Sequence, residues 1–277
     1  MPPSTSRFRS GGVCAIIPLS RMFEAEYAGQ FDVFLPGMAR MKLPLPLGGS
    51  SNHFRTAILR QVGGWDAYNV TEDADLGFRL ARFGYGSVTF ASTTFEEAPI
   101  SFGAWLRQRT RWMKGWLQTW SVHMRNPWRL WQEAGPGGFF TLNIIVGGNV
   151  LTALALPLLL YVSVVKPLLF GAVAGAPWSF GDWPSPLHSV AIAAGYLSTI
   201  VVGLLGLAHR GRLRRGWILA LTLPYWICLS IAAWRAVLQY VWNPYRWEKT
   251  DHGLAKRTGP PLLDGSTAAT AFQAYQR

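Results

Sequence analysis

The order of apolar and polar residues divides the chain into two unlike parts. From residue 139 onward, three stretches are apolar and about as long as the roughly 20 helical residues that cross a bilayer core: Phe139–Val165, His188–Ala208 and Gly216–Trp242. Pro224 and Arg235 interrupt the third stretch. Because a charge inside a span is costly, we expect a re-entrant segment there, whose last part lies along the membrane interface.

Residues 1–138 combine shorter amphipathic elements with turns. Apolar spacing and stop signals predict three helices: Arg21–Leu35 before Pro36-Gly37, Thr56–Val62 before Gly63-Gly64, and Asp73–Phe83 before Gly84. Ser87–Ala91 is predicted to be a short strand. Phe102–His123 predicts a helix with tryptophans along one side and arginines over much of the rest, a pattern typical of a helix in the membrane interface.

Composition and charge agree with a membrane protein. Half of the residues are hydrophobic, only 14% are charged and 14 are Trp, which is too apolar for an ordinary soluble domain. The net charge of +12 favours cytoplasmic retention and anionic lipid, and it argues against nucleic acid because the basic residues lie between apolar stretches. By the positive-inside rule the Arg-rich loop His209–Arg215 is cytoplasmic, as are residues 1–138 and the basic tail 243–277.

A carboxylate group of the kind needed for proton transfer stands at the start of a predicted helix. Thr71, Glu72 and Asp73 precede its first turn, so the Asp73 carboxylate could be held at a fixed point as a general base, with Thr71 as a cap. The alternative is an ordinary helix start that complements the macrodipole. Asp73-Ala74-Asp75 also spells the metal-binding pattern D-x-D. However, the two carboxylates would point about 200° apart on a helix, so we expect no metal there.

Two further groups could bind a phosphorylated sugar. Arg gives bidentate contacts to phosphate oxygens, and an indole face stacks on a sugar ring; the residues concerned are Gln108, Arg109, Arg111 and Trp112. The alternative is a basic helix that anchors in lipid headgroups. Small and polar residues in a turn let the backbone approach a ligand; these are Gly49, Ser50, Ser51, Asn52 and His53. The alternative there is a flexible polar turn.

The order of these motifs is more specific than any one of them. G-G-S-S-N-H-F-R, T-E-D-A-D-L-G, Q-R-T-R-W and then membrane helices resemble the C-terminal half of processive family-2 glycosyltransferases, the class of cellulose and hyaluronan synthases. The resemblance covers most of residues 20–255. It implies that Asp73 is the catalytic base, that residues 108–112 bind the donor diphosphate and the acceptor end, and that Gly48–His53 line the acceptor pocket.

The resemblance also implies an architecture and a location. The fold class is an α/β partial glycosyltransferase-A-type (Rossmann-like) domain followed by α-helical transmembrane segments. Its expected parts are residues 1–100 of the catalytic domain, an interfacial helix region at 101–138, transmembrane helices at 139–242 and the tail at 243–277. The protein would be a multi-pass protein of the bacterial inner membrane that uses a UDP-sugar and a polysaccharide acceptor, with its catalytic part in the cytoplasm.

One half of the active site that the resemblance implies has no counterpart among the motifs of this sequence. Members begin with a nucleotide-binding half whose strand-ending D-x-D holds Mg²⁺ or Mn²⁺, and residues 1–46 contain no such motif. We therefore expect a truncated or split transferase, inactive alone, that requires a separately encoded N-terminal half for its metal and donor. The alternatives are a non-catalytic subunit and a membrane protein unrelated to sugar transfer.

Overall fold

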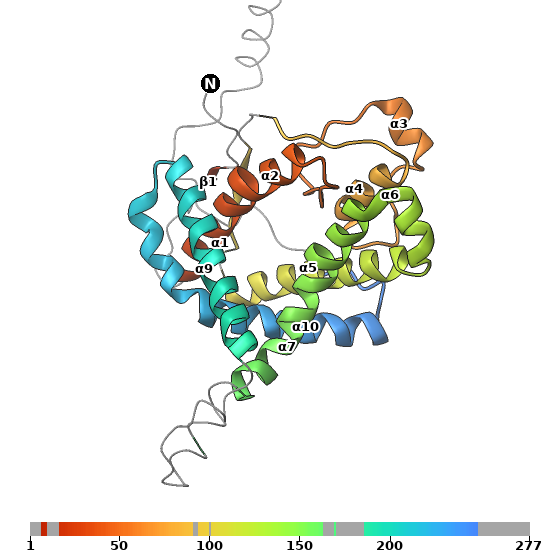
Figure 1. Ribbon diagram of the computed structural model, residues 1–277. Coiled ribbons are helices and arrows are strands. Elements are labelled where there is room, and N and C mark those ends of the chain that lie inside the picture. Colours follow the sequence, from red (N-terminus) through yellow and green to blue (C-terminus); the bar gives the residue numbers. More distant parts are fainter. Residues whose placement is uncertain are drawn as a thin grey trace, which may run out of the picture.

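A computed structural model of the protein describes residues 7–9, 17–90, 94–99, 101–162, 169 and 186–248 (Figure 1). The first described helix, α1 (Ile17–Gly29), continues through a π-helical segment, Gln30–Phe34, into α2 (Leu35–Arg40). The prediction that Pro36-Gly37 stops this helix is therefore wrong. The N–H of Leu35 donates to the carbonyl of Gln30, and this wider turn lies directly before the proline, which has no N–H to donate.

Two of the other short elements agree with the sequence. Helices α3 (Thr56–Gln61) and α4 (Glu72–Arg82) lie within one residue of their predicted bounds. Gly63 and Gly84 follow them with φ of +84° and +80°, which is the left-handed conformation that ends helices.

The predicted strand at Ser87–Ala91 is wrong for Ser87–Phe90, which has no regular structure, and Ala91 lies outside the described residues. Val88 and Phe90 are exposed, and none of the described strands pairs with this segment. Strands in the described part are instead β1 (Arg7–Arg9) and β2 (Phe95–Glu97), which pair in parallel. The partial Rossmann-like domain stays a prediction.

The long helix α5 (Phe102–His123) has the predicted bounds. Its tryptophans and basic residues do not form one exposed surface, however. Trp105, Arg109 and Lys114 are buried within the protein, and Trp112 and Trp116 are half-buried. The helix is therefore a central element that other helices cover, and its position relative to a bilayer stays a prediction.

The remaining described helices are apolar. They are α6 (Pro127–Thr141), a π-helical segment (Leu142–Gly147), α7 (Gly148–Leu160), α9 (Pro186–His209), a 3₁₀ segment (Leu213–Leu221) and α10 (Thr222–Trp242). Three helical stretches of the described part are long and apolar enough to cross a membrane: Pro127–Leu160, Val190–His209 and Leu213–Trp242. They overlap the three predicted stretches, but the first begins at Pro127 and not at the predicted Phe139. Its predicted end at Val165 lies outside the described residues. The protein thus has the features of a membrane protein.

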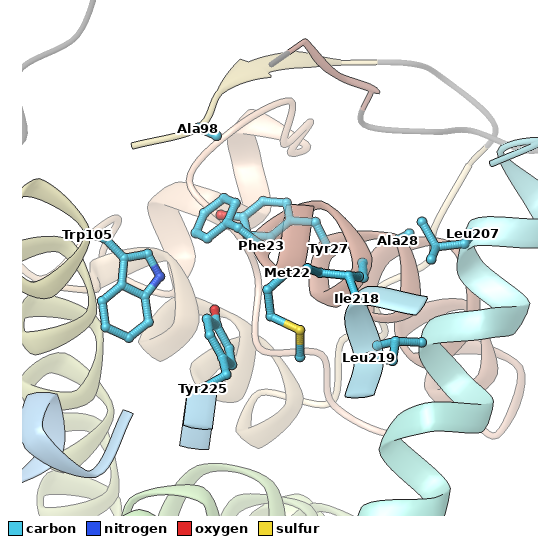
Figure 2. Packing of buried hydrophobic residues seen from close by; sticks show 11 residues of the cluster. Met22, Phe23, Tyr27, Ala28, Ala98, Trp105, Leu207, Ile218, Leu219 and Tyr225 are labelled. Atoms are coloured by element: carbon cyan, nitrogen blue, oxygen red, sulfur yellow. The ribbon is translucent and has the colours of Figure 1, made fainter. Parts of the chain in front are cut away.

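The largest apolar cluster joins the N-terminal helix to the membrane helices. Figure 2 shows Phe23 and Tyr27 of α1 beside Trp105 of α5, with Tyr225 of α10 facing the Trp105 indole. The ring centroids of Trp105 and Tyr225 are 5.4 Å apart. Burial of such large side chains contributes most of the packing free energy, so α1, α5 and α10 form one unit.

The acidic residues of the N-terminal helix neutralise part of the Arg-rich loop. Asp32 pairs with Arg210, with 2.5 Å between Oδ2 and Nε, and Glu24 pairs with both Arg212 and Arg215. Three of the four loop arginines that led to the cytoplasmic assignment are therefore partners of buried carboxylates. These contacts hold the loop against the same part of the chain that carries the site.

Helix α10 lies alongside α5, as Figure 1 also shows, and runs in the same direction. Near its start Tyr225 contacts Trp105, and after its end Gln118 donates from Nε2 to the carbonyl of Pro244 at 3.1 Å. Arg235 within α10 is paired on both terminal nitrogens with Glu248, at 2.7 and 2.6 Å. This pairing compensates the charge whose cost led us to expect a re-entrant segment.

Candidate active site

A cavity of about 670 Å³ lies between α1, α4 and α5. Nine of the twelve predicted site residues line it: Gly49, Ser50, Thr71, Glu72, Asp73, Gln108, Arg109, Arg111 and Trp112. The other three, Ser51, Asn52 and His53, line a neighbouring cavity of about 630 Å³, which Ser50 also reaches. The fold thus brings the three separate motifs together around one space.

A stripe of residues on α5 determines where the segment before α4 lies. Gly115 has no side chain at the point where Thr71 packs, since a Cβ there would overlap the Thr71 hydroxyl. One turn later, Thr119 accepts a 2.8 Å hydrogen bond from Asn69, and Gln118 Oε1 accepts the Val70 N–H at 3.1 Å. Residues four apart lie on one face of a helix, so a single face of α5 carries both the cavity residues and the contacts to this segment.

Asp73 faces the cavity from the first turn of α4. Its Oδ1 accepts the N–H of Ala74 at 2.8 Å, and a Cβ added to Gly49 would lie 3.2 Å from its Oδ2. Burial raises the pKa of Asp73 from 3.8 to about 6, and the Glu72 carboxylate beside it acts in the same direction. A carboxylate with that pKa is ionised at neutral pH and still basic enough to accept a proton.

Thr71 does not cap α4 as expected. It occupies the N-cap position, but its side chain makes no capping hydrogen bond. Its hydroxyl instead donates to Asn69 Oδ1 at 3.4 Å, and its N–H donates to the same oxygen at 3.0 Å. Thr71 is buried, whereas Glu72 is half-buried at the cavity wall. Thr71 therefore fixes the segment that leads into α4.

Arg109 is already bound by a carboxylate of the same chain. Its two terminal nitrogens donate to Glu26 at 2.7 and 2.5 Å, and the Tyr225 hydroxyl donates to the same Glu26. The guanidinium lies 4.7 Å from the ring centroids of both Phe23 and Trp112. Glu26 raises the pKa of Arg109 against the opposing effect of burial. The prediction that Arg109 binds a diphosphate is untested, and its partner here is Glu26.

Of the two cavity arginines, Arg111 has fewer partners within the described part of the protein. It is half-buried, with its guanidinium 5.7 Å from the ring centroid of Trp247, and in the described part of the chain its Nε has no hydrogen-bond partner. Burial lowers the pKa of Arg111, while Asp73 and Glu72 favour its charged form. An arginine always remains charged in proteins, so Arg111 supplies a positive charge to the cavity.

The remaining predicted α5 residues differ in role. Gln108 is buried at the cavity wall, and its Oε1 has no hydrogen-bond partner among the described residues. The half-buried Trp112 packs against Phe23 and Tyr27, each with a centroid separation of 6.2 Å. Trp116 and Trp247 also line the cavity, which therefore has several indoles on its wall.

The polar turn 48–53 separates the two cavities and is internally bonded. Asn52 donates to the carbonyl of Gly48, Ser50 donates to Glu96, and the hydroxyls of Ser51 and Thr94 lie 2.5 Å apart. His53 Nδ1 lies 3.2 Å from the carbonyl of Ser51. The turn is thus tied to the segment next to β2, which makes it more ordered than the flexible turn of the alternative interpretation.

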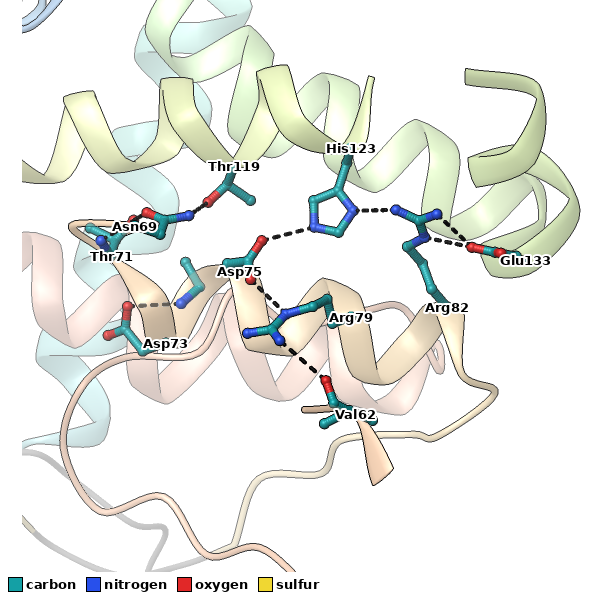
Figure 3. Close-up of polar contacts among 11 residues, drawn as sticks. Val62, Asn69, Thr71, Asp73, Asp75, Arg79, Arg82, Thr119, His123 and Glu133 are labelled. Carbon is teal, nitrogen blue, oxygen red and sulfur yellow. Dashed lines mark hydrogen bonds and ion pairs between the residues drawn. The ribbon is translucent and has the colours of Figure 1, made fainter. Parts of the chain in front are cut away.

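The second acid of the D-x-D sequence is engaged elsewhere. Figure 3 shows Asp75 on the other side of α4 from Asp73, between Arg79 and His123. Asp75 Oδ2 accepts from Arg79 Nε at 2.7 Å, and Oδ1 lies 3.1 Å from His123 Nε2. Both oxygens are used inside the protein, so Asp73 and Asp75 do not fit a shared Mg²⁺ or Mn²⁺. No group of three metal-ligating side chains occurs among the described residues.

The sequence-based prediction missed three polar or aromatic residues of the cavity wall, which are Glu26, Glu96 and Trp247. It also missed Tyr225, whose hydroxyl donates to Glu26. The signal for Glu26 was available, because an acidic residue between the large apolar side chains of Phe23 and Tyr27 needs a partner. Glu96 and Trp247 reach the site only because β2 and the chain after α10 fold back onto it, which no local pattern predicts.

Comparison with known proteins shows the family of the chain. Residues 19–245 match the model for glycosyl transferase family group 2, and the chain belongs to this family. A segment of 68 residues is 38% identical to the probable glycosyltransferase YdaM of Bacillus subtilis (strain 168), and it covers 24% of this chain and 16% of that protein.

A second relative gives a similar result. A segment of 79 residues is 33% identical to a probable glycosyltransferase of Sulfolobus acidocaldarius, and it covers 28% of this chain and 17% of that protein. The chain thus aligns with less than a fifth of the length of either curated relative. No solved structure matches the chain significantly. Family membership supports a transferase.

Proposed function

We propose that this chain carries the acceptor-and-leaving-group part of a membrane glycosyltransferase site. The reaction is hexosyl transfer from a UDP-sugar to a growing polysaccharide of the β-glucan type. The observation that supports it is the meeting, in one cavity, of the Asp73 carboxylate with its pKa near 6, the Arg111 guanidinium and several indoles.

In this proposal Asp73 acts as the general base. An acceptor hydroxyl gives its proton to Asp73 while its oxygen forms the bond to the anomeric carbon of the donor. The bond between that carbon and the diphosphate oxygen breaks, and the electron pair leaves with the diphosphate. Arg111 stabilises the developing negative charge, and an indole face of Trp112, Trp116 or Trp247 supports the sugar ring. Gln108 offers its unpaired Oε1 to a substrate hydroxyl.

Arg109 has an indirect role in this proposal. Its charge is matched by Glu26, and its guanidinium packs between aromatic rings of α1 and α5. A diphosphate would have to compete with a bidentate carboxylate for it. We therefore assign the leaving-group contact to Arg111 and the stability of the cavity wall to Arg109.

The location and partners follow from the same proposal. The site lies in the cytoplasm at the bacterial inner membrane, where UDP-sugars are found, and the apolar helices α7 and α9 lie in the bilayer. Mg²⁺ or Mn²⁺ would supply positive charge at the donor diphosphate. Because Asp73 and Asp75 do not fit such an ion, we expect its ligands on a nucleotide-binding part outside the residues printed here, in the same polypeptide or in another.

The proposal is tested with the chain in lipid nanodiscs, radiolabelled UDP-glucose, Mg²⁺ and an oligosaccharide acceptor. The assay is run with and without a nucleotide-binding part from the same locus, either fused to the chain or added separately. Other UDP-hexoses identify the donor. We expect transfer with both parts, a loss of roughly 10²–10⁴-fold in Asp73→Asn, and no loss in Asp66→Asn. Asp66 is a half-buried carboxylate outside the cavity, and Asn retains the Oδ1 that accepts the Tyr68 N–H.

Each experimental outcome tests one of the alternative interpretations. Unchanged transfer in Asp73→Asn would defeat the base assignment and favour a non-catalytic role for this chain. Polymer formation by the chain alone would show that residues 1–277 suffice to hold the donor and its metal. In Arg111→Met we expect a higher KM for the donor with an unchanged unfolding temperature, because Arg111 supports no internal ion pair of the described structure.

A further inference from the structure

A chain of partly buried polar contacts links α4 to its neighbours through residues other than Asp73 (Figure 3). Arg79 Nη1 donates to the carbonyl of Val62 at 3.2 Å, and Arg79 Nε donates to Asp75. Asp75 contacts His123 of α5, and Arg82 joins His123 to Glu133 of α6, with 2.7 Å between Arg82 Nε and Glu133 Oε2. The contacts connect the segment after α3 with α4, α5 and α6.

His123 has its proton position fixed by its two neighbours. Arg82 Nη1 lies 3.0 Å from His123 Nδ1. Because a guanidinium only donates hydrogen bonds, Nδ1 is the acceptor in this contact. The ring proton of the neutral imidazole is then on Nε2, which donates to Asp75 Oδ1 at 3.1 Å. The side chains of His123 and Asp75 are only 1% and 4% exposed, so water does not replace this contact.

The hydrogen bond between His123 and Asp75 controls the rotation of α4 about its own axis. Asp73 and Asp75 are two residues apart, so on a helix they point about 200° from one another. A rotation of α4 that displaces Asp75 therefore displaces Asp73 as well. The stripe on α5 continues from Gly115 and Thr119 to His123 at intervals of four, and these three residues contact Thr71, Asn69 and Asp75 in turn.

We propose that His123 is a positioning residue for the transfer reaction: through Asp75 it sets the orientation of α4 and hence the place of Asp73 in the cavity. This proposal rests on the proposed function, in which Asp73 is the base. His123 itself does not touch the cavity. A small displacement of a catalytic group is enough to lower the rate strongly, about 10²-fold for an ångström.

The test compares two replacements of His123 in the reconstituted transferase. Gln retains one donor for Asp75 and one acceptor for Arg82, whereas Leu retains neither. We expect His123→Leu to lower kcat by roughly 10²-fold with the donor KM unchanged, and His123→Gln to restore most of the rate. Arg129→Ala, which removes an exposed partner of Glu133, serves as the control and leaves kcat unchanged.

A combination with Asp73→Asn separates positioning from a general loss of folded protein. If His123 acts through Asp73, His123→Leu causes no further loss in kcat once Asp73 is replaced. A residue that only stabilises the fold would lower the residual rate by the same factor in both backgrounds. Equal factors, or an unchanged kcat in His123→Leu alone, would overturn the proposal.

A readout without turnover distinguishes this proposal from the proposed function. Infrared titration follows the band of the protonated carboxyl group that is absent in Asp73→Asn. We expect its midpoint near pH 6 in the wild-type chain and lower in His123→Leu, because a turned α4 exposes Asp73 to water. A shifted midpoint without transfer in the wild-type enzyme would defeat the proposed function alone. An unshifted midpoint would defeat the positioning role.

Discussion

Arg109 of α5 and Glu26 of α1 form a bidentate ion pair at 2.7 and 2.5 Å, and only 6% of the Arg109 side chain is exposed. The two residues are 83 positions apart in the sequence. Their contact fixes the N-terminal helix against the helix that carries three other predicted ligands. It also shows that an arginine in a ligand-binding motif can have a partner within the protein.

The first prediction concerns that pair. Glu26→Ala leaves the buried Arg109 charge without a partner, so we expect the unfolding free energy to fall by about 3 kcal/mol. Thermal unfolding in detergent measures it. Arg129→Ala removes an exposed arginine from an ion pair and is expected to cost under about 1 kcal/mol. Equal effects of the two replacements would contradict the assignment of Arg109 to the cavity wall.

The second prediction concerns the pH dependence of transfer. The base form of Asp73 is the ionised one, and its pKa is about 6. We therefore expect kcat to rise as pH increases through about 6 and to level off above it. Initial rates between pH 5 and 8 with saturating donor measure the profile. A profile that remains flat through pH 6 would show that another group takes the proton.

The third prediction concerns stability and its sign. The folded-state pKa of Asp73 lies above the ordinary value of 3.8, so the protonated form favours the folded state. The stability that this carboxyl group contributes is present below about pH 4 and is lost as pH rises through 6. Asp73→Asn should therefore unfold at a higher temperature than the wild-type chain at pH 8, with the difference shrinking toward pH 4. A higher wild-type unfolding temperature at pH 8 would mean that Asp73 is stabilised as a carboxylate.

The fourth prediction concerns the closest approach of α5 to the segment before α4. In Gly115→Ala the new methyl group overlaps Thr71, and the overpacking should cost roughly 1–3 kcal/mol and displace Asp73. Gly37→Ala is the matched control, because a Cβ there meets no atom within 4 Å and Ala is a better helix former. Unfolding temperature and transfer rate are measured for both. An active, fully stable Gly115→Ala would show that Thr71 can move without harm.

The fifth prediction concerns the topology of α10. Its start and the residues after its end both contact α5, and α5 carries Arg109, Arg111 and Lys114, which a bilayer core would not accept. We therefore expect α10 to lie along the membrane surface. In a chain with Cys14 and Cys228 replaced, cysteines at Leu213 and Tyr245 should be labelled from the same side. Labelling of Leu213 and Tyr245 from opposite sides would establish a crossing.

Local sequence patterns predict the helices but not their ends in every case. Phe102–His123 has its predicted bounds, because tryptophans at helical spacing are a local signal. The sequence predicts a stop at Pro36-Gly37, but a π-helical turn before the proline carries the helix on, and Phe31 and Leu35 there belong to one apolar cluster. The strand prediction is wrong for Ser87–Phe90, because a strand forms only where a partner lies beside it.

The sequence by itself determined the chemistry that the chain offers: a carboxylate at a helix start, arginines and indoles on a long helix, and apolar stretches for a membrane. These are properties of residue types and spacings of a few positions. Only the tertiary structure decided which of these groups meet a substrate. Asp73 faces the cavity while Asp75 faces His123, and Arg111 remains available while Arg109 is held by Glu26. The reason is physical, because burial and ion pairing depend on partners that lie far away in the sequence.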